Sequence, residues 1–310
     1  MTGSLRALMA RLIDYAGLFP PASLDLETTV QNFVEYTASA DAWMLGRLIC
    51  PVARFEALAP LIASGPRVSL SALCGQADTP SEWSAQVVSA MRSAGEFVSG
   101  HNASIDAVET RMPMGPRFAI REALREVLAA RSAGPLANAP IFVEIARDEQ
   151  WVDTCALIVS EIADAKAGDQ ATLGFKLRCG GVTPDAFPTS EQIAIAIDAC
   201  AHANVPIKFT AGLHHPLRHF NDGVGCDMHG FINVFTAALM AFQHGRGRDT
   251  LVSILESRDA RAFEFSDAAL RFADLSVTTK DIAALRSLVT SYGSCSFDEP
   301  RDDLATLGWR

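Results

Sequence analysis

Two lysines stand at matching places in two neighbouring apolar runs, and they carry the strongest chemical signal in this chain. Lys176 lies in TLGFKLR and Lys208 in PIKFTA, and each run ends shortly afterwards at glycine. Lysine is among the residues least often buried, so a lysine in such a run needs a reason. A second ammonium nearby and partial burial both disfavour protonation, and a partly neutral lysine is a carbonyl nucleophile of the Schiff-base type. The alternative is that each side chain extends from the end of a strand into solvent.

A helix signal separates the two lysine-bearing runs. Thr189 and Gln192 have the spacing of a capping box, and a run rich in alanine and isoleucine follows to Ala203. Strand, helix and strand over about 30 residues form one parallel βαβ unit, whose two strands end on the same rim. We therefore expect Lys176 and Lys208 to be neighbours in space.

Five further strand-like runs precede this unit, and helical patterns alternate with them. The strand-like runs are residues 12–15, 42–50, 67–74, 104–112 and 141–146, and the helical ones are 25–37, 55–62, 81–98, 117–131 and 150–165. Regular alternation of this kind predicts a parallel sheet. Seven such units in 310 residues favour a closed (β/α)8 TIM barrel, for which about 250 residues is usual, over an open doubly wound sheet. No glycine-rich phosphate-binding motif follows the first run, which also weakens the nucleotide-binding alternative.

The pattern is less regular after the seventh strand. Helices are expected at residues 230–244, 250–257 and 280–291, and residues 262–272 fit either the eighth strand or a β-hairpin. We therefore predict a single α/β barrel domain over residues 1–310, with the barrel core at about 11–230. The C-terminal part, residues 231–310, is expected to be an extension of helices with a β-hairpin as one option, and its topology stays open.

Composition and charge narrow the class of partner. The chain is 49% hydrophobic, and its net charge of −10 argues against nucleic acid, because phosphate binding needs a basic surface. No apolar run approaches the roughly 20 residues of a membrane span. Arg6, Arg11 and Asp14 interrupt any N-terminal signal sequence, and seven scattered cysteines without a CxxC motif suggest reduced thiols. We expect a cytoplasmic protein that binds a small molecule, with no membrane partner, and the choice between monomer and homo-oligomer stays open.

Polar residues gather near the predicted strand ends, where barrels of this type have their active sites. The set is Asp14, Arg47, Asp106, Glu109, Arg111, Glu144, Arg147, Lys176, Arg178, Lys208, His214 and His215. Asp106 is notable because it sits between Ile105 and Ala107, where an unpaired carboxylate is expensive. It either pairs with a cation such as a strand-end lysine or is exposed at the start of its strand. Glu144 either orients the nucleophile or bonds a neighbouring strand.

The order of these motifs resembles the deoxyribose-phosphate aldolase family of class I, Schiff-base aldolases. The resemblance covers roughly residues 11 to 213, and each motif lies at a predicted strand. The matching segments are Ile13-Asp14-Tyr15-Ala16-Gly17-Leu18, Leu48-Ile49-Cys50-Pro51, Ser104-Ile105-Asp106-Ala107-Val108, Lys176-Leu177-Arg178-Cys179-Gly180 and Lys208-Phe209-Thr210-Ala211-Gly212.

The resemblance implies a role for each member of a trio. Lys176 would form the carbinolamine and imine with a carbonyl substrate, Lys208 would hold the pKa of Lys176 down, and Asp106 would help to relay protons. No cofactor or metal is implied. Imine formation turns the carbonyl carbon into an electron sink, so a nearby carbon–carbon bond can break to an enamine while an acid/base group moves the proton. The predicted activity is therefore an aldolase-like lyase acting on a small carbonyl compound.

The region expected to bind phosphate differs from the family pattern. A Gly-Gly pair follows the second lysine in the family, whereas this chain has Gly212-Leu213-His214-His215-Pro216. A second phosphate-binding turn has only Gly293-Ser294-Cys295-Ser296 as a candidate substitute. We therefore expect a substrate other than the family's phosphorylated sugar, and Arg178 suggests recognition of a carboxylate or another acidic group. The residues expected to bind it are Asp14, Arg47, Glu109, Glu144, Arg178, His214 and His215.

Two other functions remain open from the sequence. Five potential metal ligands crowd into 16 residues after the seventh strand, namely His214, His215, His219, Asp222 and His229. They could serve a metal-dependent lyase or hydrolase. Adjacent residues of an extended strand point to opposite faces, so His214 and His215 would not easily bind one ion. The third possibility is a barrel that binds a metabolite without converting it.

Overall fold

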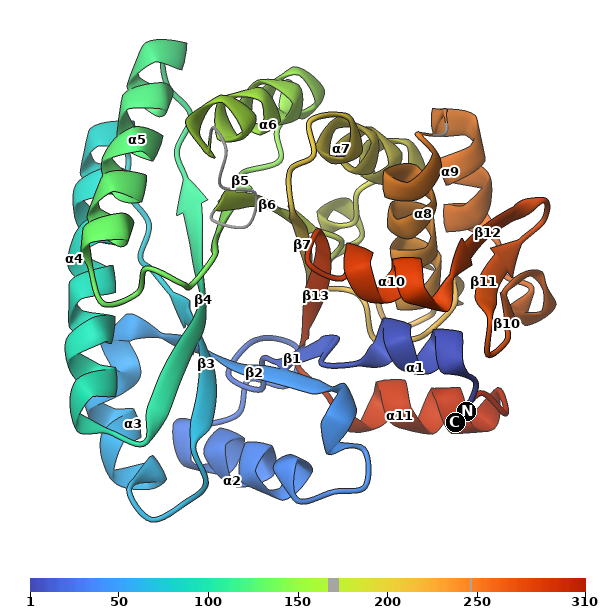
Figure 1. Cartoon of the computed structure of the whole chain (residues 1–310), viewed down its shortest axis with the longest axis horizontal. Coiled ribbons are helices and arrows are strands. Elements are labelled where there is room, and N and C mark those ends of the chain that lie inside the picture. Colours follow the sequence, from blue (N-terminus) through green and yellow to red (C-terminus); the bar gives the residue numbers. More distant parts are fainter. Residues whose placement is uncertain (167–172, 246) are drawn as a thin grey trace.

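Eight parallel strands close into a barrel in the computed structural model, which describes residues 1–166, 173–245 and 247–310. Around the barrel the strands follow the order β1, β13, β7, β6, β5, β4, β3 and β2 (Figure 1). Their bounds are β1 Ile13–Tyr15, β2 Leu45–Pro51, β3 Val68–Leu73, β4 Ala103–Met112, β5 Ile141–Ile145, β6 Leu173–Arg178, β7 Ile207–Thr210 and β13 Val289–Ser294. The predicted (β/α)8 barrel is confirmed.

Helices surround the barrel and cover its strands from outside (Figure 1). They are α1 Gly3–Met9, α2 Leu26–Thr37, α3 Phe55–Ile62, α4 Pro80–Gly100, α5 Arg117–Ala133, α6 Trp151–Lys166, α7 Ser190–His202, α8 Phe231–His244, α9 Arg248–Glu256, α10 Thr279–Leu285 and α11 Asp298–Thr306. The capping box of α7 is present, with the Thr189 side chain accepting from the Gln192 amide. The sequence patterns did not predict α1 and α11, and α10 ends at Leu285, before the end of the expected helix 280–291.

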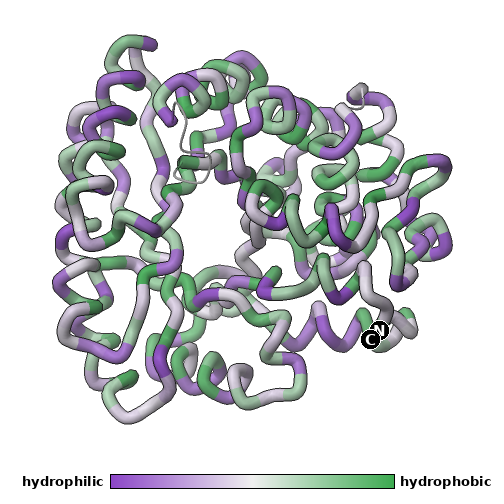
Figure 2. Tube along the Cα trace, in the orientation of Figure 1, coloured by the Kyte–Doolittle hydropathy of each residue, from purple (hydrophilic) through white to green (hydrophobic). Residues whose placement is uncertain are grey.

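The helices α4 and α8 show two ways in which sequence pattern sets burial. In α4, Trp83, Val87 and Met91 recur every fourth residue and are buried, so one stripe of the helix faces the barrel. Purple and green segments alternate along α4 and α5 in Figure 2, as amphipathic helices require. Helix α8 is apolar all round and packs against α7, α9, α10 and β13, so it is buried on nearly every side. No helix in the described ranges combines the length and apolar character needed to cross a membrane.

The eighth barrel strand is β13, and this corrects the predicted helix at residues 280–291. Helix α10 ends at Leu285, and the chain then enters the barrel between β1 and β7. The segment Val289–Ser294 pairs in parallel with both neighbours, and that pairing satisfies the edges that β1 and β7 would otherwise expose. Closure of the barrel therefore outweighs the local helical pattern in this segment.

Residues 262–272 are not the eighth strand but belong to a small antiparallel sheet outside the barrel. Its strands are β10 Glu264–Phe265, β11 Ala269–Phe272 and β12 Leu275–Thr278. The hairpin alternative is therefore confirmed, with one further strand. A second hairpin, of β8 His219–Asn221 and β9 Cys226–Met228, lies within the loop that follows β7.

Glycine at position 174 makes room for a large side chain inside the barrel. A Cβ on Gly174 would lie 2.7 Å from the Pro206 carbonyl oxygen and 2.8 Å from the Phe142 ring. Contacts this short force a shift of the neighbouring backbone or ring. The absence of a side chain at Gly174 thus lets the buried ring of Phe142 fill the barrel below the lysines.

Replacing Gly174 by alanine should lower the free energy of unfolding by about 1–3 kcal/mol, because the added methyl group overpacks this part of the barrel. The measurement is urea denaturation followed by circular dichroism. Gly65→Ala is the control, since nothing lies within 4 Å of a Cβ at Gly65. Equal stability of the two variants would contradict the packing account.

Candidate active site

Lys176 and Lys208 lie opposite each other on the adjacent strands β6 and β7. The same register continues to Glu144 on β5 and Arg111 on β4, so four strands contribute one row of charged residues. Both lysines are buried, with 6% of Lys176 and none of Lys208 exposed. The expectation that the two lysines are neighbours is confirmed, and the solvent-exposed alternative is wrong for both.

The deeper lysine, Lys208, is surrounded by anionic and hydroxyl groups. Its Nζ contacts the Asp14 carboxylate, donates to Ser291 Oγ at 3.0 Å and lies 3.5 Å from Glu109 Oε1. Asp14 also accepts from the Arg47 amide at 2.8 Å and faces the Arg47 guanidinium at 3.4 Å. The positive charge of Lys208 is therefore offset by two carboxylates.

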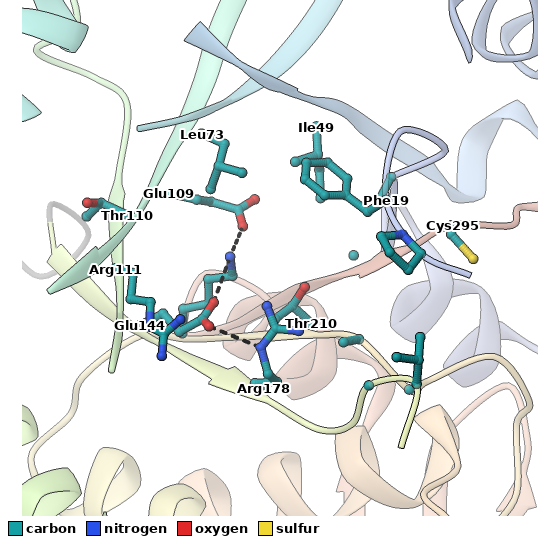
Figure 3. A pocket seen from close by; sticks show the side chains of 18 of the residues that line it. Phe19, Ile49, Leu73, Glu109, Thr110, Arg111, Glu144, Arg178, Thr210 and Cys295 are labelled. Carbon is teal, nitrogen blue, oxygen red and sulfur yellow. Dashed lines mark hydrogen bonds and ion pairs between the residues drawn. The ribbon is translucent and has the colours of Figure 1, made fainter. Parts of the chain in front are cut away.

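The second lysine, Lys176, bridges two carboxylates of its own. Its Nζ lies 2.8 Å from Glu109 Oε2 and 3.0 Å from Glu144 Oε2, and Glu144 Oε1 accepts from Arg178 Nε at 3.1 Å. Figure 3 shows these contacts as dashed lines from Glu109 through the lysine to Glu144 and Arg178. Together with the deeper contacts they form a chain of alternating charge along the barrel interior, in the order Arg47, Asp14, Lys208, Glu109, Lys176, Glu144 and Arg178.

The pKa shifts of these groups follow from the alternation. Burial favours the neutral form of Glu109 and Glu144, but the neighbouring cations and hydrogen bonds together outweigh it and lower the pKa of both carboxyl groups. The cations are Lys176 and Lys208 for Glu109, and Lys176 and Arg178 for Glu144. Burial likewise favours neutral Lys176, but Glu109 and Glu144 outweigh it and raise the pKa of the lysine. The pKa of Lys176 is therefore shifted upward, opposite to the expectation that Lys208 holds it down, because the Glu109 and Glu144 carboxylates lie only 2.8 and 3.0 Å from the Lys176 Nζ.

A cavity of about 420 Å³ opens above Lys176 at the carboxyl-terminal end of the strands. Its wall includes Glu109, Glu144, Arg111, Arg178 and His214, and an apolar part formed by Phe19, Pro20, Pro21, Ile49 and Leu73. This volume falls within the range of small-molecule sites. Lys176 lines the cavity, whereas Lys208 is fully buried beneath it, so Lys176 is the amine that a bound molecule would meet.

Asp106 lies away from both lysines, and its predicted contact with a strand-end lysine is wrong. Its carboxylate accepts from Ser69 Oγ at 2.5 Å and faces Arg11 at 3.4 Å, with 34% of the side chain exposed. The register between β3 and β4 shifts at this residue, because Leu70 pairs with Ile105 and Ser71 with Ala107. The structure therefore matches the alternative of exposure near the start of the strand. Glu109, three residues further along β4, makes the lysine contacts instead.

The histidines after β7 contact separate partners. His214 Nδ1 lies 3.0 Å from Glu299, and His215 faces Asp303, so both side chains join the loop to α11. His229 Nε2 lies 2.7 Å from the Pro188 carbonyl oxygen, and His219 packs edge-on against His215. Among the residues that the structure describes, no three His, Cys, Asp or Glu side chains are grouped to hold a metal ion. His214 alone of these histidines lines the cavity, where the sequence placed it.

The loops after β7 and β13 are where barrels of this type often bind phosphate, at a helix N-terminus. Here the first turn of α11 carries Asp298 and Glu299, whose carboxylates would repel a phosphate group. After β7, Leu213 is buried and Gly212 packs on Gly180, where an added Cβ would lie 2.8 Å from the Gly180 backbone. Whether the segment Gly293–Ser296 replaces the family's phosphate-binding turn stays a prediction.

Two serines complete the charge chain, and sequence reasoning missed both. Ser71 Oγ donates to Glu109 Oε1 at 2.6 Å, and Ser291 Oγ donates to Asp14 Oδ2 at 2.7 Å. Strand alternation places Ser71 inside the barrel, so it could have been found, whereas Ser291 fell in the segment predicted as helix. Asp14 is fully buried below the cavity, and Arg47 lines a separate cavity at the amino-terminal end with Arg286. Neither is placed to touch a molecule above Lys176.

Neither a scan against protein-family models nor a search of the curated proteins finds a match to this chain. The resemblance to the deoxyribose-phosphate aldolase family therefore stays a prediction.

Replacing Lys208 by methionine should lower the free energy of unfolding by roughly 3–5 kcal/mol, because it removes a buried cation and leaves Asp14 and Glu109 short of a partner. Chemical denaturation measures the change. Lys280→Met, at an exposed position of α10, is the matched control. A loss no greater than that of the control would show that the deep charges are not coupled as described.

Proposed function

We propose that this protein is an aldolase-like lyase that makes or breaks a carbon–carbon bond through an imine of Lys176 with a small carbonyl substrate. The observation that carries the proposal is the position of Lys176, a buried amine on the wall of a cavity and in contact with two carboxylates. Imine chemistry needs an amine nucleophile and an acid/base group within hydrogen-bonding reach of it. Glu109 and Glu144, at 2.8 and 3.0 Å from Lys176, meet the second need.

The first steps balance with these groups alone. A carboxylate, Glu144 or Glu109, takes a proton from the Lys176 ammonium, and the neutral amine attacks the carbonyl carbon. The amine proton passes to the carbonyl oxygen and gives a carbinolamine. The protonated carboxyl group returns its proton to the carbinolamine hydroxyl, which leaves as water, and a protonated imine remains. The raised pKa of Lys176 means that this proton transfer must precede attack.

Cleavage then uses the imine as the electron sink. A carboxylate removes the proton from a hydroxyl group on the β carbon, counted from the imine carbon. The bond that breaks joins this β carbon to the α carbon. The electrons of the carbon–carbon bond pass to the imine nitrogen, an aldehyde leaves, and an enamine remains. Protonation of the enamine at carbon and hydrolysis of the imine release the second product and restore Lys176. In the reverse direction the same groups form the bond.

A second candidate is a barrel that binds a metabolite without converting it. The observation that favours it is the charge balance at Lys176, whose ammonium is matched by two carboxylates and whose pKa is raised. A lysine in that state can donate hydrogen bonds to a bound molecule, but it does not attack carbonyl groups until it loses a proton. Trapping of the imine separates the two candidates.

Sodium borohydride added with a panel of aldehydes and ketones should reduce the imine and leave a stable adduct on Lys176, located by peptide mass spectrometry. Lys176→Met should form no adduct and lose all carbon–carbon lyase activity, because no other amine lines the cavity among the described residues. Lys280→Met serves as the control and should react like the wild type. Adducts on Lys280 alone, or activity in Lys176→Met, would rule out the mechanism.

The rate of borohydride trapping should rise with pH, because the neutral amine of Lys176 appears only as pH approaches its raised pKa. Glu144→Gln removes one of the carboxylates that favour the ammonium, so its pH profile should move to lower pH by about 1 unit or more. Glu264→Gln, at an exposed position of β10, should leave the profile unchanged. A shift of the Glu144→Gln profile to higher pH would contradict the electrostatic account.

A further inference from the structure

The cavity above Lys176 carries an excess of positive charge in a chain whose net charge is −10. Three cations, Lys176, Arg111 and Arg178, and two carboxylates, Glu109 and Glu144, line it. Lys176 and Arg178 already contact those carboxylates, which leaves Arg111 as the surplus charge. Within the described part of the chain, no hydrogen bond or ion pair engages the Arg111 side chain.

Arg111 and Arg178 stand on either side of Glu144. Arg111 pairs with Glu144 in the register of β4 and β5, and Glu144 pairs with Lys176 in that of β5 and β6. Neighbouring strands are about 4.8 Å apart, so the Arg111 backbone is roughly 10 Å from that of Lys176. Arg178 lies two residues beyond Lys176 on the same face of β6, and 52% of its side chain is exposed. Its Nε donates to Glu144, while its other guanidinium nitrogens make no hydrogen bond to another residue in the described part of the chain, and Arg178 lines the cavity.

The opposite wall of the cavity is apolar. Phe19, Pro20 and Pro21 follow β1, and Ile49 and Leu73 lie on β2 and β3. Figure 3 shows Phe19 and Ile49 on one side of the cavity and Arg111 and Glu144 on the other. A molecule that spans the cavity thus meets guanidinium groups at one end and a hydrocarbon surface at the other.

We propose, on the basis of the lyase function above, that the substrate is an oxo acid with an apolar substituent. Its carboxylate is held by Arg111 and Arg178, its carbonyl carbon lies at Lys176, and its apolar group packs against Phe19 and its neighbours. A guanidinium presents two parallel N–H donors that match a carboxylate, which makes arginine the usual residue for this task. A phosphate is disfavoured because the first turn of α11, where such barrels often bind one, carries Asp298 and Glu299.

Phenylpyruvate and phenylacetone test the proposal, because they share the aromatic group and the ketone. They differ only in that phenylpyruvate carries a carboxylate where phenylacetone carries a methyl group. Isothermal titration with the full chain should give at least tenfold tighter binding of phenylpyruvate, since a charge-assisted bidentate contact contributes that much or more. Arg111→Met should remove this preference, and Arg111→Lys should retain part of it, because lysine keeps the charge without the paired donors. Arg271→Met, exposed on β11, should keep the full preference.

Equal binding of the two ketones, or an unchanged preference in both Arg111→Met and Arg178→Met, would overturn the proposal. Tighter binding of dihydroxyacetone phosphate than of phenylpyruvate would overturn it in favour of a phosphorylated substrate. Phe19→Ala should weaken the binding of phenylpyruvate but not that of pyruvate. Equal weakening of both would contradict the proposal that an apolar group packs against Phe19.

Borohydride trapping in the same samples separates this inference from the proposed lyase function. Lys176 could form adducts with phenylacetone and phenylpyruvate alike, while the two ketones bind equally well. That result would support an imine at Lys176 and overturn the proposal that the substrate is an oxo acid. An Arg111-dependent preference for phenylpyruvate without any adduct would support recognition of the acid and overturn the lyase.

Discussion

The interior of this barrel depends on a run of alternating charges that extends from Arg47 through Asp14, Lys208, Glu109, Lys176 and Glu144 to Arg178. An isolated charge in a protein interior is very unfavourable, and only paired and hydrogen-bonded charges are tolerated there. Each inner member of the run has an opposite charge on both sides, and Ser71 and Ser291 donate further hydrogen bonds to Glu109 and Asp14. Four positive and three negative groups can therefore occupy space that hydrophobic side chains fill in most barrels.

This run links the stability of the barrel to the properties of the cavity. Glu109 contacts both lysines, so the ionisation of the cavity amine and that of the deep pair are not independent. Glu109 and Glu144, which favour the ammonium form of Lys176, both contact its Nζ and could accept its proton. In the proposed lyase, a substrate carbonyl at Lys176 would therefore meet an acid/base group next to the amine. Arg178 extends the run to the cavity mouth and adds a positive charge there.

The C-terminal segment contributes to the site in two ways. Strand β13 closes the barrel and brings Ser291 to Asp14, and α11 is joined to the loop after β7 through His214 and His215. Asp298 and Glu299 occupy the first turn of α11, where they pair with Arg301 and His214, whereas Arg111 on β4 and Arg178 on β6 line the cavity.

The sequence by itself determined the barrel, the pairing of strands β6 and β7, and the meeting of Lys176 with Lys208. Those features follow from local periodicity and from the geometry of one βαβ unit, both of which are visible in a short stretch of chain. Only the tertiary structure decided which carboxylate reaches the lysines: Glu109 contacts both, whereas Asp106, three residues earlier on β4, contacts Ser69 and Arg11. It also decided the direction of the pKa shift of Lys176 and the identity of the eighth strand. A pKa depends on every charge within a few ångströms, and barrel closure depends on edges more than 200 residues apart, so neither is encoded in any local pattern.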